Sequence, residues 1–127
     1  MNSLVHIKVF NNLLNDFLNF LEETFPIISS DIILTRSIIN VLGSNNPRII
    51  VEQFMSSVSM YKKQIFDCDE KFFLNFEENG IKVNSQNLMH GLKIKQLWLD
   101  SKTTNEQKAY IWLYFQKLLR TGEKVLL

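Results

Sequence analysis

Four neighbouring residues have the side chains with the clearest chemical potential: Asp67, Cys68, Asp69 and Glu70. Clustered carboxylates can bind a divalent cation, but a calcium loop needs further oxygen ligands and a turn glycine at fixed spacing, which this stretch lacks. Asp67 is instead expected to cap a short helix, with Asp69 and Glu70 in its first turn, where the helix dipole favours negative charge. The cluster therefore predicts a helix start, and we expect no metal site.

Catalysis by Cys68 would require a base and an orienting group, and the sequence offers neither at a recognisable spacing. His6 and His90 are the only histidines, and no cluster of Cys, His or carboxylate accompanies them at metal-ligand spacing. His6 falls on the apolar side of the first predicted helix, which indicates a partly buried structural role. Glu77 and Glu78 are expected to be a solvated helix end rather than an acid–base pair. Glycine-rich phosphate loops and nucleophile-elbow motifs are also absent from the sequence. We therefore expect a non-enzyme with no catalytic residues, cofactor or small-molecule ligand.

The charge balance argues against non-specific binding to nucleic acid. The formal net charge is only +1, so no overall field attracts a phosphate backbone. Lys93 and Lys95 are two residues apart and do not share a helix face. A protein partner or self-association is the expected mode of interaction, and nucleic-acid binding is not expected.

The N-terminal sequence and the cysteine content bear on location. The first 23 residues, MNSLVHIKVFNNLLNDFLNFLEE, lack the basic segment and the cleavage site of a signal peptide. Polar residues interrupt their apolar ones, so they predict no membrane span. A single cysteine, Cys68, is typical of a reducing compartment. We expect a protein that is not secreted.

Hydrophobic periodicity predicts helices along the whole chain. Their expected ranges are 3–25, 30–43, 47–66, a short helix from 67, 87–99 and 103–121, with a loop over 77–87. The expected N-caps are Ser30 or Asp31, Asn46 followed by Pro47, and a Thr–Glu capping box within 103–106. The expected helix stops are Pro26, Gly43 and Gly122. Gly91 interrupts the helix expected over 87–99. Few Gly and Pro residues leave little turn chemistry for a sheet.

Two long segments have a core-facing stripe at helical spacing. The stripe of 3–25 consists of Val9, Phe10, Leu13, Leu14, Phe17, Leu18, Phe20 and Leu21. The stripe of 103–121 consists of Ile111, Trp112, Phe115, Leu118 and Leu119. On the opposite side of the second segment, Tyr110 and Leu113 lie beside Lys117 and Arg120. These four residues are the candidate partner-contact patch.

The stretch LKIKQLWLDSKTTNEQKAYIWLYFQKLLRTGEK, together with IFDCDEKFFLNF, resembles short uncharacterised proteins of nucleocytoplasmic large DNA viruses (giant viruses). The resemblance implies a viral context, and with it the host cytoplasm or the virion. The abundance of Asn, Ile, Lys and Phe is compatible with the AT-rich genomes of such a source. Within this stretch we expect Trp98 and Trp112 to pack across a helix–turn–helix hairpin.

These observations predict an all-α protein: a single compact domain, residues 1–127, of five to six helices in bundle-like or orthogonal packing. The leading function is a small non-enzymatic helical interaction or structural module, virion-associated or binding a host protein. One alternative is a Bcl-2-like groove binder that inhibits host death or innate signalling. Another is a nucleic-acid-associated accessory factor. A groove binder requires an exposed apolar cleft, whereas an oligomer component requires a flat self-complementary patch.

Overall fold

A computed structural model describes residues 3–74 and 94–126. Within these residues the chain is all α, without strands, and the predicted fold class is confirmed. The elements are α1 (Ser3–Thr24), η1 (Pro26–Ile28), α2 (Ser29–Gly43), α3 (Arg48–Val58), η2 (Ser59–Tyr61), α4 (Lys62–Phe66), α5 (Lys71–Leu74), α6 (Ile94–Leu99) and α7 (Asn105–Leu126). Several parts of the sequence discussed above lie outside the described residues. They are the loop predicted over 77–87 and the single residues Glu77, Glu78, His90, Gly91 and Lys93.

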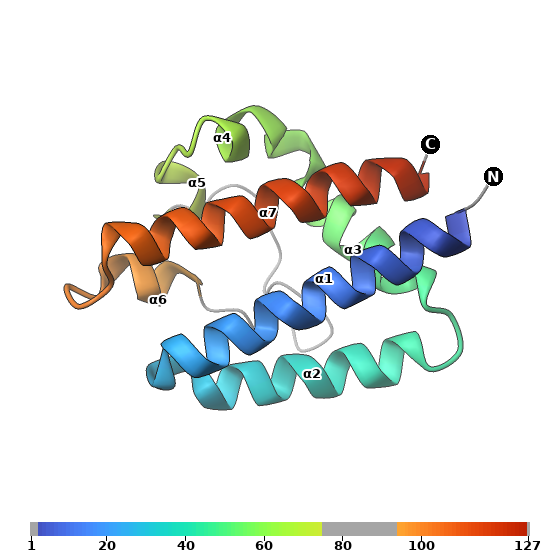
Figure 1. Ribbon diagram of the computed structural model, residues 1–127, viewed down its shortest axis with the longest axis horizontal. Helices are drawn as coiled ribbons and strands as arrows, with labels where there is room; N and C mark the ends of the chain where they lie inside the picture. The colour runs from blue at the N-terminus through green and yellow to red at the C-terminus, as the bar shows by residue number, and fades with distance from the viewer. Residues whose placement is uncertain (1–2, 75–93, 127) are drawn as a thin grey trace.

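The two longest helices, α1 and α7, run antiparallel and pack side by side, and α1 lies between α7 and α2 (Figure 1). The stripe predicted for α7 is buried at all five positions. The ring of Phe17 stacks on Tyr114 at 4.9 Å and meets Phe115 edge-on at 5.6 Å. Such offset and edge-to-face contacts stabilise aromatic cores beyond the area they bury. These rings join the first and last helices into one core.

The stripe predicted for α1 is confirmed except at Val9. Phe10, Leu14, Phe17, Leu18 and Leu21 are buried, and Leu13 and Phe20 are partly buried against the same core. Val9 is exposed, whereas Ile7, which the prediction omitted, is buried. At about 100° per residue, Ile7 falls close to Leu14 on the wheel and Val9 falls well to the side. The buried arc of α1 is therefore rotated slightly from the predicted one.

The helix predicted over 47–66 is wrong as a single element. It ends at Val58, whose φ of −124° leaves the helical range, and a 3-10 turn leads into α4. Just before the break, the hydroxyls of Ser56 and Ser57 both donate to the carbonyl of Gln53, an alternative to regular helix bonding that serine often adopts. The turn lets α4 lie along α7, where the side-chain amide of Gln116 donates to the carbonyl of Ile65.

The side-chain oxygen of Asn46 accepts from the backbone N–H of Arg48, as predicted for a cap, but α3 begins at Arg48, and Pro47 lies at the N-cap position. Ser30 and Asp31 do not cap α2, because η1 runs directly into it and the N–H of Ser29 donates to the carbonyl of Pro26. The cap predicted at Asp67 is also wrong. Asp69 caps α5 by accepting from the N–H of Lys71, while Asp67 forms an ion pair with Lys63.

The capping box of the last helix is displaced by one residue from the predicted Thr103–Glu106 pair. The N–H of Thr104 donates to the side chain of Gln107, and the N–H of Gln107 donates to the hydroxyl of Thr104. The reciprocal geometry is the one expected of a capping box, with Gln in place of Glu.

Helix α2 ends at Gly43 as predicted, whereas Gly122 does not act as the predicted stop. Gly122 is buried inside α7, which continues to Leu126. A Cβ at Gly122 would lie 2.8 Å from the Cγ of Met55, so this glycine permits the close crossing of α7 and α3. Gly43 is the last residue of α2, but its φ lies outside the left-handed region. A Cβ at Gly43 would lie 3.6 Å from the Ile50 Cγ1, an ordinary van der Waals contact, so the space there does not require glycine.

The left-handed cap in the described chain is at Cys68, with φ of 54°. The N–H of Cys68 donates to the carbonyl of Ile65, and the N–H of Asp69 donates to that of Gln64. These two bonds form a Schellman motif that ends α4 and places Cys68 at the position where glycine is usual.

Replacement of Cys68 by Gly should therefore raise the free energy of unfolding by about 1 kcal/mol, because glycine adopts positive φ without a steric cost. Urea denaturation of the wild type and Cys68→Gly measures the change. Cys68→Ala is the matched control and should bring no gain, because alanine retains the Cβ. An equal gain in both variants would contradict this explanation.

Candidate functional site

The predicted contact patch on α7 is exposed at all four positions, Tyr110, Leu113, Lys117 and Arg120. Two of these side chains already make contacts within the molecule. The Arg120 guanidinium lies 4.7 Å from the ring centre of Phe66, a cation–π contact. Tyr110 forms a tilted ring contact with Phe20. The patch offers two apolar side chains among cations, and its role in binding a partner stays a prediction.

Tyr114 lies one turn from Tyr110, and burial, with a smaller contribution from the charge of Asp16, raises the pKa of its phenol above the ordinary value of 10.0. The folded state therefore favours the neutral phenol. Its contribution to stability is present below the unfolded pKa and is lost as pH rises through the folded pKa. Between about pH 9 and 11, Tyr114→Phe should lose less stability than the wild type. Thermal unfolding measured at several pH values across this range gives the difference. Equal slopes of unfolding temperature against pH for the two proteins would contradict the prediction.

The carboxylates of the cluster make local contacts: Asp67 pairs with Lys63, and Asp69 caps α5. Within the described ranges, no group of three or more His, Cys, Asp or Glu side chains is arranged to hold a metal. The Glu70 carboxylate accepts from the Trp98 indole N–H at 3.2 Å, and Lys108 lies 3.8 Å from the same carboxylate. Trp98 and Trp112 meet at 5.5 Å, which confirms their predicted packing between α6 and α7. Glu70 therefore links α6 and α7 next to the two tryptophans.

The residues considered for nucleophilic chemistry are separately engaged. Cys68 is exposed, and its sulfur accepts a weak hydrogen bond from the side-chain amide of Gln116 at 3.6 Å. An amide cannot take the thiol proton, so this neighbour cannot act as the base that a cysteine nucleophile requires. His6 is partly buried on α1, as its position on the wheel predicts.

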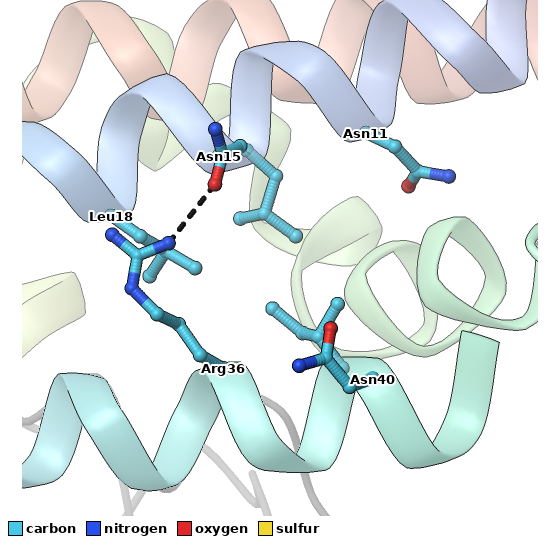
Figure 2. Close-up of a pocket in the computed structure, with 7 residues that line it drawn as sticks. Asn11, Asn15, Leu18, Arg36 and Asn40 are labelled. Carbon is cyan, nitrogen blue, oxygen red and sulfur yellow. Dashed lines mark hydrogen bonds between the residues drawn. The ribbon is translucent and has the colours of Figure 1, made fainter. Parts of the chain in front are cut away.

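A pocket of about 140 Å³ lies between α1 and α2 (Figure 2). Its lining consists of Asn11, Leu14, Asn15, Leu18, Arg36, Ile39 and Asn40. Arg36 reaches from α2 toward α1 and donates to the side-chain oxygen of Asn15 at 2.9 Å.

The chemistry of this pocket is limited by its side chains. Arg36 also binds the Asn19 side chain and pairs with Glu22 at 3.2 Å, so its charge is balanced. The Asn11 side-chain oxygen is buried without a hydrogen-bond partner. Side-chain amides do not ionise and the Arg guanidinium keeps its proton near neutral pH, so these lining residues offer polar contacts without a general acid or base.

The side of α2 that faces away from α1 is exposed, mainly apolar and uncharged. We call it the α2 outer face. Its residues are Ile27 of the preceding turn, Ser30, Ile33, Leu34, Ser37, Val41 and Ser44. The exposed fractions of the four large apolar residues are 62% for Ile27, 56% for Ile33, 48% for Leu34 and 74% for Val41.

Sequence reasoning did not single out this face, although a signal was present. Ile27, Leu34 and Val41 recur every seven residues, and so do Ser30, Ser37 and Ser44. On a helix these positions fall within an arc of about 100°. This seven-residue spacing is hard to recognise in the sequence, because the apolar residues of 32–34 and 38–39 place apolar side chains on every side of α2. A helix of that kind is usually buried, yet here only Ile32 and Thr35 within α2 are fully so.

One stretch of the described residues, Pro26–Gly43, is long and apolar enough to cross a membrane by length and composition. This is weak support for a span, because core helices and N-terminal signal sequences pass the same test. Arg36 and Ile32 in this stretch face α1 and the core, so in the fold described here the stretch is an edge helix with one face packed (Figure 1).

Comparison with protein-family models, curated proteins and solved structures found no match to the chain. The class that the fold and its surfaces define is an all-α domain with an aromatic core and an uncharged apolar outer face on one edge helix.

Proposed function

We propose that the protein is a small non-enzymatic helical interaction or structural module and that the α2 outer face is its contact surface. The observation that carries the proposal is the exposure of Ile27, Ile33, Leu34 and Val41 on one side of one helix. Single exposed apolar residues are ordinary, but a contiguous group at regular spacing is typical of interaction surfaces. The viral context, and with it the host cytoplasm or the virion, stays a prediction from the resemblance.

The surface chemistry supports this proposal over the two alternatives. A groove binder would need an apolar cleft, whereas polar side chains make up much of the lining of the α1–α2 pocket, with Arg36 crossing it. A nucleic-acid partner would need free cations on one surface. Several cations of the described chain pair with carboxylates, as Arg48 does with Glu52 and Lys62 with Glu123.

Photo-crosslinking in cells tests the proposal. A photoreactive amino acid is placed at Leu34 on the α2 outer face and, as the matched control, at Leu113 on α7, which has a similar exposed fraction, 42% against 48%. We expect specific intermolecular protein adducts from position 34 and a different or weaker set from position 113. Absence of intermolecular adducts at position 34 would contradict the proposal. Adducts specific to position 113 would show that the contact surface is the predicted contact patch on α7.

A further inference from the structure

We infer that the partner of the α2 outer face is a second copy of this chain, bound through antiparallel packing of α2 against α2 about a two-fold axis at Ser37. The inference rests on the proposed function, since it names the occupant of the same surface. Three properties of the face support it: its charge, its satisfied hydroxyl groups and the symmetry of its spacing.

The face has no charged side chain at an exposed position. From Pro26 to Asn46 the charged residues are Asp31 and Arg36, and both are partly buried; Arg36 extends toward α1. A two-fold interface brings a surface against itself, so a charge close to the axis would meet its own copy and be repelled. A neutral apolar face avoids that repulsion. A membrane surface rich in anionic lipid would favour Lys or Arg beside the apolar stripe, and this face has none.

The polar groups on the face can be buried at low cost. The hydroxyl of Ser37 donates to the carbonyl of Ile33 at 3.2 Å, and that of Ser44 donates to the carbonyl of Val41 at 3.0 Å. Burial of an unpaired hydroxyl is unfavourable, but these donors already have acceptors within their own helix. Ser37 and Ser44 can therefore enter a dry interface without losing these hydrogen bonds.

The spacing of the face is symmetric about Ser37. Ser30 and Ser44 lie seven residues on either side of it, and the β-branched residues Ile33 and Val41 lie four residues on either side. With two helices antiparallel and Ser37 at the axis, serine faces serine and Ile33 faces Val41 of the second copy. Small side chains at the crossing let the two helices approach closely, and the apolar residues beside them pack into the space.

Sedimentation equilibrium of the purified full chain tests the pairing. Over increasing protein concentration we expect a mass that approaches twice the 15.0 kDa of one chain. Leu34→Glu places one charge on each copy at the α2–α2 interface. It should weaken association at least tenfold, which corresponds to about 1.4 kcal/mol in the free energy of association. Leu113→Glu is the control and should leave association unchanged. Both substituted positions are exposed, so the folded state is retained, as circular dichroism verifies. A monomer at all concentrations, or equal effects of the two substitutions, would overturn the inference.

Cysteine crosslinking tests the antiparallel geometry. In a Cys68→Ser background, Ser37→Cys should form a covalent dimer under mild oxidation, because residue 37 of each copy meets its equivalent at the axis. Ser56→Cys is the matched control: Ser56 is also an exposed helical serine whose hydroxyl donates to its own helix, in this case to Gln53. Equal crosslinking at both positions would overturn the geometry.

The two proposals fail in different ways. If the purified chain is a monomer while position 34 crosslinks to a different protein in cells, the second-copy inference fails and the proposed function stands. If the chain is a monomer and position 34 gives no intermolecular protein adduct, both fail. Binding of the monomer to vesicles of anionic phospholipid, lost in Leu34→Glu, would also overturn the second-copy inference.

Discussion

Phe115→Ala should lower the free energy of unfolding by about 3–5 kcal/mol, the usual cost of removing a fully buried Phe ring. Phe115 is completely buried on α7. Its ring contacts Phe17 of α1, Phe54 of α3 and Phe73 of α5, at centroid distances of 5.6, 5.8 and 5.1 Å. A single truncation therefore leaves a cavity that four helices share. Typical domains have only about 5–15 kcal/mol of stability, so this loss is a large fraction of it.

Chemical denaturation monitored by circular dichroism measures this loss. Leu113→Ala is the control on the same helix, because Leu113 is exposed and its truncation should change the free energy of unfolding by no more than about 0.5 kcal/mol. Equal losses in the two variants would show that α7 does not join the core through its predicted face.

Gly122→Val should lower the free energy of unfolding by about 1–3 kcal/mol, the usual cost of overpacking a core. The new Cβ would lie 2.8 Å from the Met55 Cγ and closer still to the sulfur. Met55 is itself almost fully buried, so it cannot move out to solvent without exposing apolar area. The gain in helix propensity over glycine is a few tenths of a kcal/mol and does not offset this clash.

A double-mutant cycle with Met55→Ala isolates the contact. Removing the methionine side chain makes room for the valine, so the double variant should be at least about 1 kcal/mol more stable than the sum of the single effects predicts. Strict additivity would mean that Gly122 is required for a reason other than its distance from Met55.

The position of the core on each long helix is encoded locally and was predictable. On α7, the spacing of Ile111, Trp112 and Phe115 fixes a narrow arc, and charged residues occupy the other side. A pattern of this kind depends only on the helix period. Trp98 and Trp112 were likewise paired correctly, since a short polar turn between two helices brings their ends together.

Features that depend on a second helix were not predictable. A glycine that ends a helix and a glycine that lets two helices touch look the same in one sequence, and Gly122 is the second kind. The break after Val58 is also set by tertiary structure, because the segment that follows is redirected along α7. The α2 outer face was missed because apolar residues lie all round α2, so the sequence alone did not separate its inward side from its outward side.

The pairing of α1 with α7 also has a consequence for synthesis on the ribosome. Phe17 finds Tyr114 only after the intervening chain has been made, and at about 5–20 residues per second that takes roughly 5–20 s. Throughout this interval the apolar face of the nascent first helix has no partner from the last one. Until translation ends, the growing chain therefore exposes an apolar helix face of the kind that chaperones shield.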